Sequence, residues 1–168
     1  MSYAAAIARI FRLDDEGWRR HANPWSGWTR VASGPLLFAA VWSAHGIGWW
    51  SLVPIAAVTL WTWLNPRLFA PPAHYEAWVS RAVLGERAWI ALPRDRIPTR
   101  HRRGPHVLNA LGAPLLAPLA VGVALQDLTL ALAAFGGVVL LKFWFLDRMV
   151  LLWDDVRADG DAFPGPAP

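Results

Sequence analysis

The hydrophobic residues of this chain gather in two long stretches, residues 31–64 and 107–146, which carry almost no charge. Polar and charged residues lie before, between and after them. Most of the 12 tryptophans stand where an apolar stretch meets a polar one, and indole rings prefer that position at a membrane surface. A tryptophan-rich soluble core is the alternative, but soluble cores do not exclude charge over such long runs. The pattern therefore predicts an all-α integral membrane protein.

Each apolar stretch is long enough for two membrane crossings, because one crossing needs about 20 residues, with roughly 17 as the lower limit. The first stretch is broken at residues 45–48, where Gly46 and Gly48 flank one residue. The second is broken at Gln126 and Asp127, since a carboxylate at mid-bilayer costs ~2.5 to 3.5 kcal/mol and a turn avoids that cost. We therefore predict four transmembrane helices arranged as two hairpins, at about 31–47, 49–65, 107–125 and 128–147.

The other segments predict smaller elements within a single membrane domain of residues 1–157. Residues 2–13 and 74–84 have hydrophobic side chains at helical spacing, which is typical of amphipathic helices that lie on a membrane surface. Gly85 is expected to end the second of these helices. The tail, residues 158–168, is rich in glycine, proline and alanine and is expected to be disordered.

The positions of the basic residues predict the orientation of the chain. All 16 lysines and arginines lie before residue 31, between residues 67 and 103, or from Lys142 onward, and neither short turn holds one. Basic residues are enriched on the cytoplasmic side of a membrane. We therefore expect a multi-pass protein of the cell (inner) membrane with both termini and the segment 66–106 in the cytoplasm. Lys142, near the inner end of the last crossing, is expected to extend toward the headgroups.

Residues 94–103 form a basic run that suits either nucleic acid or anionic lipid. No RNA-stacking or helix-turn-helix pattern accompanies it in the sequence. The run is held beside a negatively charged leaflet, which attracts each basic residue by ~1 kcal/mol. The expected partners are therefore the lipid bilayer and its anionic headgroups, and not nucleic acid. A protein partner and a homo-oligomer remain open.

Polar residues at the inner membrane face form the one candidate site. As structure, Asn23 turns the chain into the first crossing and Ser26 caps it. An ion pair of Asp147 with Arg30 or Arg67 would then lock the two hairpins together, because an unpaired buried ion is costly. As a binding site, the same groups would hold an anionic headgroup or a small ligand. The candidate residues are His21, Asn23, Arg30, Asn65, Arg67, Asp147 and Arg148.

No complete catalytic, metal or cofactor motif can be assembled from the sequence. Cysteine is absent, and no two histidines stand at i and i+4 with an acidic third ligand. We expect a non-enzymatic protein that binds lipid or a partner through its inner-face residues, with no metal and no cofactor. One alternative is a membrane-surface enzyme or ligand carrier that uses His21, Asn23 and Asp147. Another is an oligomeric channel or transporter.

Four stretches carry a family resemblance, beginning with His-Ala-Asn-Pro-Trp-Ser-Gly-Trp-Thr-Arg at residues 21–30 and continuing at 63–69, 80–87 and 142–150. With these motifs the chain resembles a family of small, uncharacterised prokaryotic integral membrane proteins that is classed as a domain of unknown function. The resembling part runs from residue 21 to about 154. The resemblance implies a one-domain membrane protein and supplies no activity to transfer.

Overall fold

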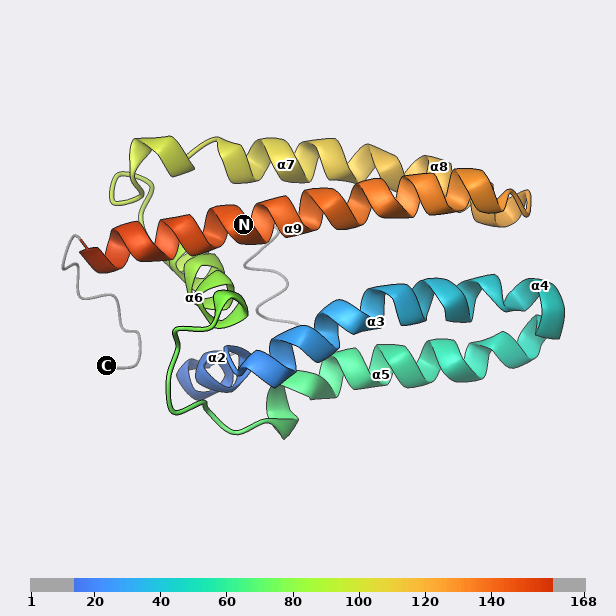
Figure 1. Ribbon diagram of the computed structural model, residues 1–168, viewed down its shortest axis with the longest axis horizontal. Coiled ribbons are helices and arrows are strands. Elements are labelled where there is room, and N and C mark those ends of the chain that lie inside the picture. Colours follow the sequence, from blue (N-terminus) through green and yellow to red (C-terminus); the bar gives the residue numbers. More distant parts are fainter. Residues whose placement is uncertain (1–13, 159–168) are drawn as a thin grey trace.

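The protein is helical in the part that its computed structural model describes, residues 14–158, where no strand occurs. The all-α prediction is confirmed. Two pairs of long helices lie side by side and a short helix joins them at one end (Figure 1). The predicted helix at 2–13 and the predicted disordered tail, apart from Ala158, lie outside the described residues. The elements are α2 (Asp15–His21), α3 (Pro24–Trp42), α4 (Ala44–Ile47), η1 (Gly48–Ser51), α5 (Leu52–Leu68), α6 (Trp78–Ala91), η2 (Thr99–His101), α7 (Gly104–Gly112), η3 (Ala113–Leu115), α8 (Leu116–Ala124) and α9 (Leu128–Ala158).

The helices α3 and α5 form the first pair, and the chain reverses between them at the predicted glycines. Gly48 has a φ of 56°, a backbone conformation that glycine adopts without steric cost. The short elements α4 and η1 carry the chain around this turn, after which α5 runs back along α3 (Figure 1). The predicted break in the first apolar stretch is therefore confirmed as a tight turn.

The second pair consists of α9 and the interrupted helix α7–η3–α8, which packs along it. The chain reverses at Gln126, which has a φ of 58°, and the Asp127 carboxylate accepts a hydrogen bond of 2.9 Å from the Leu130 amide. This side chain therefore satisfies a free amide at the start of α9. The two helices approach closely near the turn, because a Cβ at Gly122 would lie 2.6 Å from the Ala131 nitrogen.

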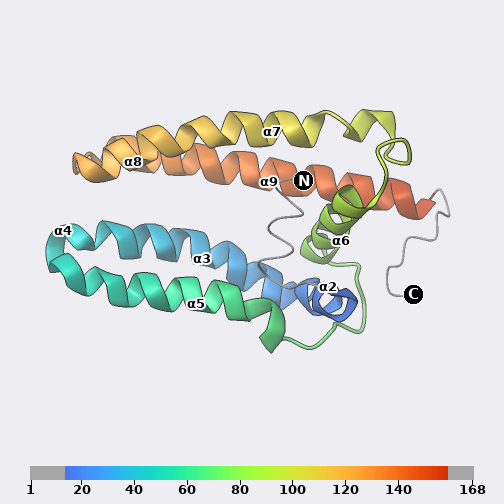
Figure 2. The ribbon, with the colours of Figure 1, turned by 180° about the vertical axis from the view of Figure 1, so that it is seen from behind.

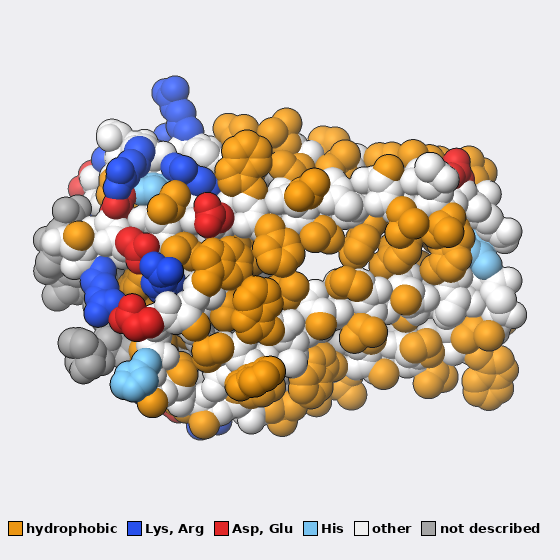
Figure 3. All heavy atoms as spheres, in the orientation of Figure 1, with side chains coloured by type: hydrophobic (Ala, Val, Ile, Leu, Met, Phe, Trp, Pro, Cys, Tyr) orange, Lys and Arg blue, Asp and Glu red, His pale blue; other side chains and the backbone are white. Residues whose placement is uncertain are grey.

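Three helical stretches are long and apolar enough to cross a membrane: Pro24–Leu68, Thr99–Ala124 and Leu128–Ala158. The first includes both helices of the first pair. At most 17% of each apolar window is buried inside the protein, so most hydrophobic side chains face outward. Figure 3 shows hydrophobic side chains covering the helix pairs, while most charged side chains gather at one end. This distribution is compatible with a multi-pass membrane protein.

The helix α9 continues well beyond the crossing predicted at residues 128–147. Its 31 residues span about 46 Å at 1.5 Å per residue, more than the ~30 Å of hydrocarbon. The extension packs against α6, where Met149 and Leu152 are fully buried. An ion pair of 2.9 Å between Arg81 and Asp154 joins the same two helices. The last third of α9 thus belongs to the charged end of the molecule.

The helix α6 is a packing centre, and the predictions of a surface helix at 74–84 and of a stop at Gly85 are wrong. The helix begins at Trp78 and runs through Gly85 to Ala91. A Cβ at Gly85 would lie 1.9 Å from the Met149 carbonyl oxygen, so this glycine permits α6 to cross α9 in close contact. On another side, a Cβ at Gly27 of α3 would lie 2.2 Å from a Val79 methyl group. Figure 2 shows α6 between the two helix pairs.

Aromatic rings also connect the two helix pairs. Trp78 of α6 stacks between Trp28 of α3 and Phe143 of α9, with centroid separations of 6.0 and 6.1 Å. Nearer the far end, Phe38 of α3 stacks on Phe135 of α9 at 4.9 Å. Figure 3 shows an opening through the molecule between the two helix pairs. The two pairs are therefore packed together at the charged end and touch only locally elsewhere in this view.

Replacing Gly85 by alanine is expected to destabilise the protein by about 1–3 kcal/mol, because the new methyl group would overlap backbone that cannot move independently. An alanine in a helix otherwise gains roughly 0.5–1 kcal/mol over glycine. Gly136→Ala in α9 is the matched control, since nothing lies within 4 Å of that position. Thermal unfolding in detergent, followed by circular dichroism, measures both. A G85A protein as stable as G136A would contradict the close crossing of α6 and α9.

Candidate functional site

A connected set of polar side chains lies at the charged end of the first helix pair. We call it the Arg30 cluster and define it as Ser26, Thr29, Arg30, Asn65 and the main-chain carbonyl of His21. Ser26 and Asn65 are fully buried, although they are polar residues of strongly apolar helices. Such groups are stable there only if their hydrogen bonds are made within the protein.

Asn23 and Pro24 place these residues by starting α3. The Asn23 side-chain oxygen accepts hydrogen bonds from the amides of Trp25 and Ser26, at 2.9 and 3.3 Å, and Pro24 occupies the first helical position. The Asn23 side-chain nitrogen donates to the Ala70 carbonyl at 2.9 Å, which ties the end of the first helix pair together. The prediction that Ser26 caps this helix is therefore wrong, because Asn23 performs that role.

The hydrogen bonds of the Arg30 cluster connect side chains of α3 with Asn65 of α5. Arg30 Nη1 donates to Ser26 Oγ at 2.6 Å and to Asn65 Oδ1 at 3.1 Å. Ser26 Oγ donates to the same Asn65 oxygen at 2.7 Å. Asn65 Nδ2 donates to Thr29 Oγ1 at 2.8 Å, and Thr29 Oγ1 donates to the Trp25 carbonyl at 2.7 Å. Because arginine can only donate, it fixes which way the Asn65 amide faces.

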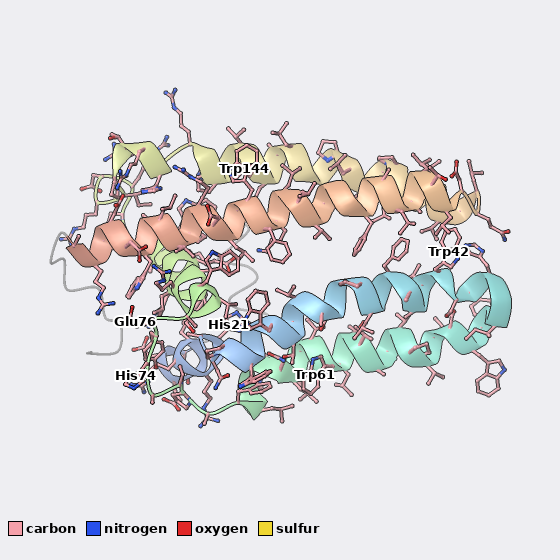
Figure 4. All side chains as sticks on the ribbon, viewed as in Figure 1. His21, Trp42, Trp61, His74, Glu76 and Trp144 are labelled. Atoms are coloured by element: carbon pink, nitrogen blue, oxygen red, sulfur yellow. The ribbon has the colours of Figure 1, made fainter. Side chains whose placement is uncertain are left out.

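His21 joins the cluster through its backbone, while its ring is kept neutral. Arg30 Nη2 donates to the His21 carbonyl at 3.1 Å, which links α2 to α3. Burial lowers the pKa of the imidazole well below its usual range, and the positive charges of Arg30 and Lys142 lower it further. Its Nδ1 is buried and has no hydrogen-bond partner within residues 14–158. Figure 4 shows His21 at the end of α2, near the start of α3.

The other three predicted site residues lie apart from this cluster. Arg67 bonds to the Trp63 carbonyl and stacks its guanidinium over the Trp63 ring at 4.2 Å. Asp147 accepts a hydrogen bond of 3.4 Å from the Trp78 indole, and Arg148 donates to the Arg100 carbonyl at 3.5 Å.

The predicted lock between the helix pairs is therefore wrong. Among the described residues, no ion pair joins Asp147 to Arg30 or Arg67. The hydrogen bonds that exist go to neutral acceptors; they join α3 to α5 within the first helix pair and α2 to α3. Trp78 and the rest of α6 connect that pair to α9 instead.

The model of a family of unknown function, DUF6653, matches residues 2–165 of the chain. The chain belongs to this family. The resemblance drawn from its sequence motifs is thereby confirmed at the level of a family of unknown function. Comparison with curated proteins and with solved structures gives no match.

The geometry of this DUF6653 chain links the predicted site residues only in part. Asp147 lies on α9 and bonds to the Trp78 indole, and no hydrogen bond or ion pair in residues 14–158 joins it to His21 or Asn23, the other two residues suggested for an enzyme or carrier. No group of three or more histidine, aspartate or glutamate side chains in residues 14–158 is placed to hold a metal ion. What the Arg30 cluster does provide is a positive charge held by neutral acceptors.

Sequence reasoning missed two members of the cluster, Ser26 and Thr29. A signal for them exists, because Ser26, Thr29 and Ser33 follow one another at helical spacing in an otherwise apolar helix. Their hydroxyls all bond within the first helix pair, Ser33 to the Thr29 carbonyl at 3.0 Å. A polar stripe of this kind marks the face of a membrane helix that meets another helix.

Replacing Asn65 by leucine is expected to destabilise the protein by about 1–3 kcal/mol, since Ser26 and Arg30 would lose their shared acceptor and the leucine offers no hydrogen bond. Thr62→Ala is the control on the same helix, because the Thr62 hydroxyl bonds only to the Val58 carbonyl of its own helix. Thermal unfolding in detergent compares the two variants. An N65L protein that unfolds at the same temperature as the T62A protein would show that the Arg30 cluster contributes little stability.

Proposed function

We propose that this protein crosses the cell (inner) membrane four times, with both termini and the segment 66–106 in the cytoplasm, and that it binds anionic lipid headgroups without catalysing a reaction. The four crossings would be α3, α5, α7 with α8, and the first two thirds of α9. The two turns lie together at the end opposite the basic residues (Figures 1 and 3). That arrangement supports an orientation with the turns outside, because basic residues favour the cytoplasm.

The observation that carries the headgroup proposal is the bonding of the Arg30 guanidinium. Arginine has five N–H donors, and the bonds to Ser26, Asn65 and His21 use three of them. Nε and the second hydrogen of Nη2 have no protein acceptor in residues 14–158, and no carboxylate there forms an ion pair with Arg30. Arginine can bind two phosphate oxygens at once through Nε and one Nη, so we expect these donors to suit a phosphate.

Neighbouring charges favour an anion beside Arg30. The pKa of the His21 imidazole is lowered chiefly by burial and further by the positive charges of Arg30 and Lys142. One carboxylate offsets them, since Glu86 lies 4.0 Å from the Lys142 amine. Two cations and one anion leave this inner corner positive, and a phosphate group would balance it.

Part of the basic run adds to the same surface. Arg100 pairs with Asp155, and Arg102 bonds to the Ile97 and Asp95 carbonyls at 2.6 and 2.9 Å, so these two arginines hold the loop together. The remaining three, Arg94, Arg96 and Arg103, are exposed, and their side chains form no hydrogen bond or ion pair with the described chain. They are available to anionic lipid, each with an attraction of ~1 kcal/mol.

Cysteine labelling tests the four crossings directly, because the natural sequence contains no cysteine. Single cysteines at Gly46 and Leu125 are expected to react with a membrane-impermeant maleimide in intact cells or spheroplasts. Cysteines at His74 and Asp95, both exposed, are expected to react only after the membrane is opened. Labelling of the 74 or 95 position from outside, or of one turn without the other, would refute the proposed topology.

The Arg30→Gln variant is expected to lose most of its bound anionic lipid, about fivefold or more relative to the natural protein, because the phosphate would lose a charged fork. Arg30→Lys keeps the charge and the contact to Ser26 but not the fork, so it should fall in between. Native mass spectrometry in mild detergent, with phosphatidylglycerol added, measures retention.

Arg157→Gln is the control for net charge, because Arg157 pairs with Glu76 at the far end of α9. Only variants with the natural protein's circular dichroism spectrum are compared. Equal phosphatidylglycerol retention by R30K, R30Q and R157Q would refute headgroup binding at Arg30.

A further inference from the structure

A groove with one carboxylate runs along α9, between Leu115 of η3 and Trp78 of α6, and none of its lining residues belongs to the Arg30 cluster. Its volume is about 710 Å³, within the range of sites for small ligands. Leu115, Leu140, Phe143 and Trp144 supply apolar walls. Asp147 and Trp78 lie at the end nearest the charged part of the molecule. The groove is therefore amphipathic along its length.

Asp147 lies at the depth where hydrocarbon gives way to headgroups, if α9 crosses the membrane as proposed above. It follows Leu128 by 19 residues, which is about 28 Å of helix against ~30 Å of hydrocarbon. It is the first acidic residue of α9. From this position the groove extends toward Gly137, about three helical turns deeper into the proposed membrane region.

The Asp147 carboxylate is not neutralised within the described chain. It accepts the 3.4 Å hydrogen bond from the neutral Trp78 indole, and no arginine or lysine in residues 14–158 forms an ion pair with it. Lys142, five residues earlier, lies over the Phe145 ring and beside Glu86 instead. An exposed carboxylate at a membrane surface, above an apolar groove, favours a ligand with a cation at one end and a hydrocarbon chain at the other.

We propose that this groove binds a zwitterionic phospholipid with a primary ammonium headgroup, such as phosphatidylethanolamine, with one acyl chain along Leu140 and Leu115. The ammonium group would donate hydrogen bonds to Asp147, which a trimethylated choline headgroup cannot do. The Trp144 ring, one helical turn before Asp147 and 59% exposed, provides an aromatic face for the same cation. An anionic lipid is disfavoured here because its net charge has the sign of the carboxylate.

The test compares lipids that share their acyl chains and differ in their headgroups. The protein in mild detergent is offered phosphatidylethanolamine, phosphatidylcholine and phosphatidylglycerol, and native mass spectrometry counts the lipids retained. The natural protein is expected to retain phosphatidylethanolamine at least fivefold over phosphatidylcholine. Asp147→Asn should abolish that preference, and Asp147→Lys should favour phosphatidylglycerol. The D147N side chain would keep an oxygen for the Trp78 indole, so the fold should be retained.

Asp95→Asn is the control, because Asp95 is an exposed carboxylate on the cytoplasmic loop whose side chain forms no hydrogen bond or ion pair with the described residues. D95N should keep the natural preference. Equal retention of the two zwitterionic lipids by the natural protein, or an unchanged preference in D147N, would overturn the proposal. So would a dimer that D147N dissociates, since the occupant would then be a second copy of this chain.

The two lipid proposals fail separately. Arg30→Gln should lower phosphatidylglycerol retention and leave the preference for phosphatidylethanolamine over phosphatidylcholine. Asp147→Asn should leave retention of phosphatidylglycerol at Arg30 intact. A loss of both lipids in both variants would refute two distinct sites.

Discussion

The structure depends on one constraint, which is that hydrocarbon offers no hydrogen-bond partner to a polar group. The backbone meets this constraint by forming helices. The side chains meet it by position, since charged residues stand almost entirely at one end of the molecule (Figure 3). Where polar side chains enter the apolar helices, as Ser26, Thr29 and Asn65 do, they bond to one another across the helix pair. The Arg30 cluster is a direct result.

The charged end is also where the fold is held together. There α6 lies against α9 and α3 at distances that only glycine permits, at Gly85 and Gly27. Arg87, with only 8% of its side chain exposed, pairs with Asp15 at 2.5 Å and fastens α2 to α6. Burial lowers the pKa of Arg87, and the negative charge of Asp15 opposes that shift. The helices proposed to cross the membrane therefore extend from a packed base at the charged end.

The sequence predicted the helix pairs well, because their signals are local. Two glycines predicted the turn at residues 45–48 through their backbone conformation. Asp127 predicted the other turn through its charge, which disfavours a position inside an apolar helix. The role of α6 could not be predicted in this way. Glycine often ends a helix, so the sequence predicted that Gly85 ends α6. Only the Met149 backbone packed against Gly85 shows that α6 crosses α9 there.

The candidate site was predicted in part for the same reason. The structure brings His21, Arg30 and Asn65 into hydrogen-bond contact, and Asn23 bonds beside them to Ala70; the sequence grouped them because Asn-Pro corners mark helix ends near one surface. Asp147 was placed with them because it has the same depth along its helix. Depth does not fix the direction in which a side chain points around the helix, and Asp147 points to Trp78.

The opening between the helix pairs is bounded by contacts on both sides. The pairs are held together by α6 at one end and touch through the Phe38 and Phe135 rings near the other. Stacked aromatic rings of α3, α6 and α9 thus set how far apart the two pairs stand. These rings act as spacers, and the width of the opening follows from their size.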